Sequence, residues 1–254
     1  MTVQPSVNFS PAADFYDRTR GGEARGRRIA PAIAERTVKG PLLLDAGTGT
    51  GVVALALTDL GHSVVGIDLS HSMLTKAVER IGRTVAAASL TALPFPDGTF
   101  TQVYSVWVTH VVGDLRAGLR EVHRVLEPGG RYVVVPGMIL FDDHPVSRIM
   151  EEIQSRTAEA DDRAERIVPL AESVGFTAVE VGELEAATHE HSPELIASGL
   201  EQRMLFHLWA VDDTVFDRQV APFIETLRAL PDPDRPVVRR TRRQIVVLEK
   251  RGRP

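Results

Sequence analysis

Three glycines stand at alternate positions, Gly47, Gly49 and Gly51, directly after a run of leucines and Asp45. Glycine adopts positive φ and lets another molecule approach the backbone closely. If the last of them opens a helix, the N–H groups of its first turn can receive an anion. The carboxylate of Asp45 would repel a pyrophosphate but could pair with an ammonium group. These residues therefore predict a ligand that has a cationic part.

The spacing of the glycines separates this turn from two better-known phosphate sites. A dinucleotide turn reads G-x-G-x-x-G and a P-loop ends in G-K-[ST], whereas this chain has G-x-G-x-G and no lysine. Asp68 closes a second apolar segment, at about the distance where an acidic residue meets a ribose diol. It could instead cap the following helix together with Ser70. Two carboxylates around a glycine turn suit a nucleoside joined to an amino acid, and a ligand-free turn is the alternative.

Alternating strands and helices are expected to position these residues. Strands are predicted over 42–47, 63–69, 84–89, 100–108 and 131–137, and helices over 24–38, 51–61, 72–82 and 114–126. Such alternation is typical of a parallel sheet with helices on both faces, which binds ligands at the carboxyl ends of its strands. Beyond Pro136 the segments 145–175, 192–213 and 217–230 are mainly helical, and strands are predicted over 177–188 and 242–250.

Four segments in order resemble the motifs of class I S-adenosylmethionine-dependent methyltransferases, in their small-molecule branch. The segments are 43–57, 64–74, 90–112 and 119–135, and the likeness runs from about Phe15 to Val135. The resemblance implies an α/β fold with a Rossmann-like, doubly wound, mostly parallel seven-stranded sheet, helices on both faces and a helical lid. It divides the chain into an N-terminal helical arm or cap (1–40), a cofactor-binding core (41–136) and the rest of the core (137–254), with lid insertions around 138–162 and 192–235.

The resemblance also implies S-adenosylmethionine as cofactor. Asp45 then meets its amino group, Asp68 its ribose hydroxyls, and Ser89 stands where the family usually has an acid facing the adenine. The expected cofactor-binding residues are Tyr16, Arg20, Asp45, Ala46, Gly47, Thr48, Gly49, Gly51, Asp68, Leu69, Met73, Ser89, Leu90 and Trp107. For Trp107 plain core packing is the alternative, and for Arg20 a solvated arginine on the N-terminal arm.

Methyl transfer from a sulfonium is an in-line displacement, so the protein mainly aligns and desolvates the reactants. A base is needed where the acceptor, such as a phenol or an amine, keeps its proton at neutral pH. His110 is the first candidate because it follows the fourth strand, and His144 and His207 are further candidates. Structural roles are the alternative for each. A small organic acceptor is expected, with oxygen or nitrogen favoured over carbon.

Composition limits the other classes. The 254 residues carry a net charge of −5 and include no cysteine, which excludes disulfides and thiolate metal sites. An acidic chain is a poor general binder of nucleic acid, and no segment is typical of a signal peptide or a membrane span. We therefore expect a cytoplasmic protein, bacterial by its arginine- and alanine-rich composition and active in secondary metabolism. Its expected partner is a small-molecule acceptor, without nucleic acid or membrane, and a homodimer stays open.

Two short motifs remain outside this scheme. His189 and His191 would share one face of a strand, but no third ligand accompanies them, so no metal site is expected. The basic run 239–243 is interpreted as a solvated edge before the last strand. A non-catalytic module or regulatory subunit that binds S-adenosylmethionine is the main alternative function, and a nicotinamide-dependent oxidoreductase is a third. The acceptor itself cannot be predicted from the sequence.

Overall fold

A computed structural model describes residues 16–17, 21–158, 161–204, 208 and 211–252 of the chain. The chain forms two compact units. The core unit comprises Met1–Gly137, Asp162–Leu184 and Gln244–Pro254, and the inserted unit comprises Met138–Asp161 and Glu185–Arg243. The chain therefore leaves the core unit twice and returns to it twice. The role of a lid, expected for parts of the inserted unit, stays a prediction.

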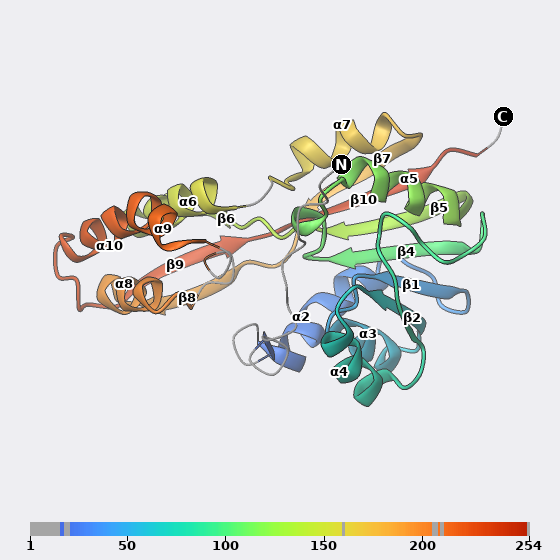
Figure 1. Cartoon of the computed structure of the whole chain (residues 1–254), viewed down its shortest axis with the longest axis horizontal. Coiled ribbons are helices and arrows are strands. Elements are labelled where there is room, and N and C mark those ends of the chain that lie inside the picture. The colour runs from blue at the N-terminus through green and yellow to red at the C-terminus, as the bar shows by residue number, and fades with distance from the viewer. Residues whose placement is uncertain (1–15, 18–20, 159–160, 205–207, 209–210, 253–254) are drawn as a thin grey trace. The chain divides into compact units, whose positions relative to one another are not determined.

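A seven-stranded sheet forms the centre of the core unit, in the order β3-β2-β1-β4-β5-β10-β7 (Figure 1). Its strands are β1 Leu42–Ala46, β2 Ser63–Asp68, β3 Val85–Ala87, β4 Phe100–Val106, β5 Leu126–Val135, β7 Phe176–Glu183 and β10 Gln244–Lys250. The first five run parallel, and only β10 is antiparallel to its neighbours β5 and β7. The predicted mostly parallel, seven-stranded sheet is confirmed.

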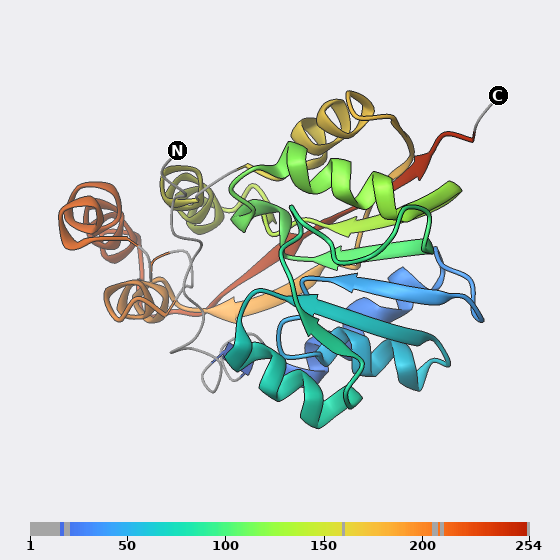
Figure 2. The ribbon, with the colours of Figure 1, turned by 45° about the vertical axis from the view of Figure 1, so that its right-hand side comes forward.

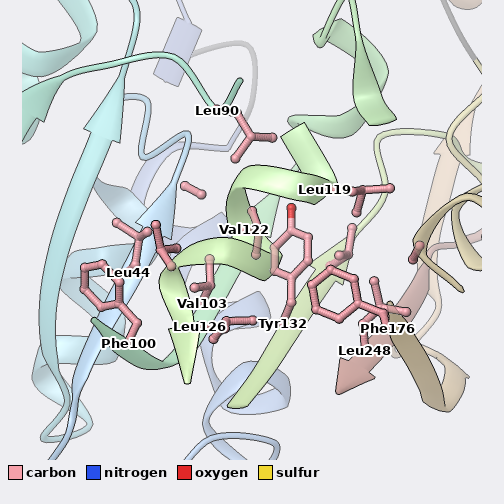
Figure 3. Packing of buried hydrophobic residues seen from close by; sticks show 14 of the residues in the cluster. Leu44, Leu90, Phe100, Val103, Leu119, Val122, Leu126, Tyr132, Phe176 and Leu248 are labelled. Carbon is pink, nitrogen blue, oxygen red and sulfur yellow. The ribbon is translucent and has the colours of Figure 1, made fainter. Parts of the chain in front are cut away.

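Helices cover both faces of this sheet (Figure 2). Neighbouring strand residues point to opposite faces, so Leu43 packs in one apolar cluster with α2 (Gly22–Ala34) and α3 (Val52–Asp59), and Leu44 packs in another with α5 (Leu115–Val125) and α7 (Ala164–Glu172). A fifth helix, α4, spans His71–Ile81. Figure 3 shows the second cluster, where the rings of Tyr132 and Phe176 lie 6.4 Å apart.

Helix α2 lies directly against the start of α3. A Cβ added to Gly26 would stand 2.1 Å from the carbonyl oxygen of Val52, so only glycine permits this approach. Ile29 and Ile33 of the same helix are buried among residues of α3 and the sheet. The described helix of the N-terminal region thus contributes to the core and fixes the backbone that follows the glycine turn.

The join between α5 and β5 differs from the sequence prediction. We expected the helix to end near 126 and the strand to begin at 131, but β5 begins at Leu126, directly after the helix. Gly129 adopts a φ of 78°, and the pairing with β4 shifts register between Phe100 and Gln102. The glycines therefore form an irregularity within a paired strand, where a helix stop alone was predicted.

In its described residues, the inserted unit combines four α-helices with a second sheet. Its helices are α6 Pro145–Thr157, α8 Pro193–Glu201, α9 Asp213–Gln219 and α10 Ala221–Arg228, and its antiparallel strands follow the order β6 (Leu140–Phe141), β9 (Val237–Arg242), β8 (Ala187–His191). This sheet was not predicted. The segment 177–188, expected as one strand, contributes to β7 and β8 in two different sheets, and the supposed solvated edge at 239–243 is largely β9. Among the described residues, no helix is both long and apolar enough to cross a membrane.

Candidate functional site

The glycine turn joins the end of β1 to the start of α3, and its three glycines have positive φ. The values are 98° at Gly47, 55° at Gly49 and 78° at Gly51. A Cβ at Gly47 would stand 2.3 Å from a methyl of Val108, and one at Gly51 3.1 Å from the Cα of Ala77. A Cβ at Gly49 would meet nothing within 4 Å. Two glycines are therefore required by packing, and the third leaves an open face of backbone at the carboxyl edge of the sheet.

Asp68 connects this turn to the end of β2. Its Oδ2 accepts a hydrogen bond from the Gly49 amide, and its Oδ1 accepts one from the Ser70 amide, both at 2.8 Å. Burial raises the pKa of Asp68, and the backbone amides that donate to it oppose that rise. The predicted cap is thus present, because the Ser70 side chain accepts from Met73 at the start of α4. Asp68 also anchors the glycine turn.

Asp45 is almost completely buried at this edge, with 2% of its surface exposed. Burial raises its pKa to about 7, the nearby hydroxyls of Tyr104 and Thr48 lower it in part, and the charge of Asp68 raises it further. Neither hydroxyl has a hydrogen-bond partner of ordinary geometry among the described residues. A buried acid with so little compensation is suited to a cationic group, which would favour its ionised form.

Three side chains form a stack beside the end of β4. The guanidinium of Arg25 lies 5.1 Å from the ring centre of Tyr16 and 5.0 Å from that of Trp107. Trp107 has a φ of 59°, which is costly for a bulky residue and places its ring just past the strand end. The sequence singled out Tyr16 and Trp107 but missed Arg25, because a charged residue within a helix has no local signal of burial. Arg20 lies outside the described residues.

Asp17 ties the N-terminal segment to the glycine turn. Its carboxylate accepts a hydrogen bond from the Thr50 hydroxyl at 2.7 Å and pairs with Arg80 at 2.7 Å. Arg80 also donates to the Thr50 carbonyl at 2.6 Å. These contacts place Tyr16 next to the turn.

The remaining residues expected to bind the cofactor have varied surroundings. Ala46, Thr48, Met73 and Leu90 are buried, and Leu69 is exposed. The Ser89 hydroxyl lies 2.8 Å from the Thr91 hydroxyl and accepts from the Thr91 amide, so it is engaged in its own turn.

His110 lies next to a fully buried carboxylate that the sequence did not reveal. Its Nδ1 is 3.5 Å from Asp162 Oδ2, and that oxygen accepts hydrogen bonds from the Thr109 hydroxyl at 2.6 Å and the Gly137 amide at 2.7 Å. Burial opposes ionisation of Asp162, but these three partners outweigh it and lower its pKa. Asp162 stands 52 residues beyond His110 in a segment with no motif, so no sequence signal joins the two.

Gly137 makes the approach of His110 possible. A Cβ at this position would stand 2.1 Å from Nδ1 and 2.3 Å from Cε1 of the imidazole. Gly137 ends the stretch that follows β5, so β4 and β5 bring His110 and Gly137 to the same edge as the glycine turn.

His144 and His207 are the other two candidate bases. His144 caps helix α6 in the inserted unit, where its Nδ1 accepts from the Val146 amide at 3.2 Å. His207 lies outside the described residues. Within the described parts of the chain, no three His, Asp or Glu side chains are grouped to hold a metal ion.

Known proteins resemble this chain in both sequence and fold. The family of methyltransferase domains matches residues 44–134. A ubiquinone/menaquinone biosynthesis C-methyltransferase of Geobacter sulfurreducens is 35% identical over 160 residues, which are 58% of this chain and 60% of that protein. A demethylmenaquinone methyltransferase of Mycolicibacterium gilvum is 33% identical over 174 residues, 65% of this chain and 76% of that protein.

Among solved structures, phosphoethanolamine N-methyltransferase 2 of Haemonchus contortus, in complex with S-adenosylhomocysteine, superposes with a TM-score of 0.59. It is 20% identical, and the likeness covers 99% of this chain and 61% of that one, which shows a shared fold. This chain spans about three fifths of the length of the first curated relatives it matches. The sheet order, the glycine turn with its two acids and these matches together show that the chain belongs to the class I S-adenosylmethionine-dependent methyltransferase family.

Proposed function

We propose that this protein transfers the methyl group of S-adenosylmethionine to a small organic acceptor. The observation that carries the proposal is the buried Asp45 beside the open backbone of Gly49. A buried acid whose pKa lies near 7 gains most from a cationic partner, and the amino group of the cofactor is such a partner. The glycine face gives room for the methionine part to approach the backbone.

The other residues at this edge fit the rest of the cofactor. Asp68 accepts one amide on each oxygen and retains acceptor capacity for the ribose hydroxyls. The rings of Tyr16 and Trp107, joined through Arg25, offer apolar and cationic surface beside the turn. Ser89 is occupied by its own turn, so we expect the adenine to be held mainly by Leu69, Leu90 and Met73 and by backbone groups.

The bound cofactor supplies an activated methyl group, and the protein supplies alignment and a proton acceptor. We assign the role of proton acceptor to His110, whose imidazole is oriented by Asp162 through the ring nitrogen Nδ1. This leaves Nε2 as the nitrogen able to take a proton from the acceptor molecule. Thr109 and Gly137 fix the carboxylate, so the imidazole has one preferred orientation.

The class of acceptor rests on the relatives. Their names describe carbon methylation in quinone biosynthesis, which favours a carbon acceptor over the oxygen or nitrogen expected from the sequence. A ring carbon of a hydroquinone becomes nucleophilic when its neighbouring hydroxyl loses a proton, and this requires a base. A quinol-type ring is therefore the first acceptor to test.

A turnover assay tests the proposal. The purified full chain is incubated with S-adenosylmethionine and a demethylated quinol, with catechol and aryl amines in parallel, and S-adenosylhomocysteine is quantified. Product that depends on both acceptor and His110 supports the proposal, and the position of the new methyl separates carbon from oxygen or nitrogen. Cofactor binding without turnover on any acceptor would favour the alternative of a non-catalytic binding module.

A further inference from the structure

The proposed function leaves two motifs unused, the pair His189 and His191 and the basic run 239–243. They lie on neighbouring strands of the inserted unit. Strands β8 and β9 pair antiparallel, with His189 opposite Arg239 and Ala187 opposite Thr241. Residues directly opposite each other in such a pair share one face of the sheet. His189 Nε2 also lies 2.8 Å from the Thr241 hydroxyl, and its ring stacks on that of His191 at 6.3 Å. One face of this pair therefore collects an arginine, imidazoles and a hydroxyl.

This face is covered at Arg239, whereas His191 at its end is exposed. Val238 and Arg240 alternate with Arg239 along β9, and both are exposed, whereas Arg239 has only 6% of its surface exposed. The Arg239 Nε is buried without a hydrogen-bond partner, and the guanidinium forms no ion pair with any residue in the described part of the chain. A buried arginine is normally paired, because removing its charge from water is costly.

The charge of Asp142 acts on Arg239, but the oxygens of this carboxylate accept hydrogen bonds from other groups. Asp142 accepts hydrogen bonds from the amides of His144 and Arg240. Burial lowers the pKa of Arg239, and the charge of Asp142 opposes this without forming an ion pair. The guanidinium thus keeps its planar set of donors available for a partner from outside the chain.

We propose that Arg239, flanked by His189 and Thr241, binds an oxyanion, the carboxylate or phosphate group of a small ligand. The guanidinium fork matches both groups in a bidentate geometry, and the Thr241 hydroxyl is a further polar group on the same face.

The test compares the wild type with Arg239→Met and with Arg240→Met, its exposed neighbour on the opposite face of the same strand. The probes are inorganic phosphate and sodium benzoate, titrated at constant ionic strength with chloride as reference, and the readouts are the melting temperature and the calorimetric Kd. We expect one or both oxyanions to raise the melting temperature of the wild type and of Arg240→Met. We expect Arg239→Met to bind at least about tenfold more weakly. A response to benzoate points to a carboxylated ligand, and a response to phosphate alone to a phosphorylated ligand or to free phosphate.

Without oxyanion, Arg239→Met is expected to melt at or above the wild-type temperature, because an unpaired buried charge is replaced by an apolar chain of similar length. Arg239→Lys, which keeps the charge but lacks the fork, is expected to bind with intermediate strength. The proposal is overturned if the wild type responds to neither oxyanion, if Arg240→Met loses the response as well, or if Arg239→Met is destabilised equally with and without oxyanion.

Cofactor binding separates this inference from the proposed function. Arg239→Met is expected to bind S-adenosylmethionine with the wild-type Kd. If the wild type responds to oxyanions but binds no S-adenosylmethionine, the anion site stands and the proposed function fails.

Discussion

The amide of Gly49 donates a 2.8 Å hydrogen bond to Asp68 Oδ2, and this contact joins the glycine turn after β1 to the end of β2. Asp68 thus shapes the turn in addition to offering acceptors to a ribose. Asp68 also acts on the second acid of the site, because its charge raises the pKa of Asp45.

Replacing Asp68 by alanine is expected to weaken S-adenosylmethionine binding by at least about tenfold, since it removes both the anchor of the turn and a charged acceptor. Asp59→Ala, which removes an exposed acid at the end of α3, serves as the control and should bind normally. Calorimetry at pH 8 measures both. Equal affinities would show that neither the turn nor the ribose depends on Asp68.

Cofactor affinity is expected to depend on pH through Asp45. Its pKa in the free protein is about 7, so below that pH the carboxyl is largely protonated and must lose a proton before it pairs with an ammonium. Affinity should therefore fall by up to about tenfold per pH unit below pH 7. Asp45→Asn should bind weakly with no such slope. A wild-type affinity that is flat between pH 5.5 and 8 would contradict this role.

Gly137→Ala is expected to displace His110, because the new Cβ would stand 2.1 Å from its Nδ1. We expect a loss of about 1–3 kcal/mol in the free energy of unfolding, together with a fall in kcat. The matched control is Gly113→Ala, near His110 in sequence, where an added Cβ meets nothing within 4 Å. Urea unfolding and turnover of both variants check this. Equal behaviour of the two would mean that the close packing of His110 has no consequence.

Asp162→Asn tests how His110 is oriented. We expect kcat to fall by about ten- to a hundredfold, less than for His110→Asn, with an unchanged Kd for S-adenosylmethionine. The ¹⁵N shifts of the His110 imidazole should also change, because the neighbouring acceptor is altered. Asp143→Asn, at a fully exposed carboxylate, is the control. A variant that loses stability but keeps kcat and the imidazole shifts would assign Asp162 a purely structural role.

Much of the cofactor edge could be predicted from the sequence because its signals are local. The glycines, Asp45 and Asp68 each stand where a strand ends, and parallel strands bring those ends to one edge. Asp162 could not be predicted, because it reaches His110 from a segment whose composition is typical of a solvated helix. Arg25 was missed for a similar reason, since its burial depends on Tyr16 and Trp107, which are distant in sequence.

The sheet of the inserted unit was not predicted, because polar and charged residues stand at positions of β8 and β9 where a half-buried strand usually has apolar ones. In β9 the buried position is Arg239, and in β8 the same face carries the half-buried His189 and the exposed His191, so neither strand shows the apolar alternation by which strands are predicted. Such a departure from the usual pattern is expected where a site is built. The same residues that obscured the strand carry the inferred anion site.

The most direct test of the account is the binding of S-adenosylmethionine by the full chain, measured by calorimetry at pH 8 beside Gly49→Val. The substitution puts a branched side chain on the open face of a residue with a φ of 55°, so strain and obstruction both act at the turn. We predict saturable, one-to-one binding by the wild type that is lost in the variant while circular dichroism shows both to be folded. Absence of binding by the folded wild type, with or without acceptor, would contradict the assignment of the glycine turn to this cofactor.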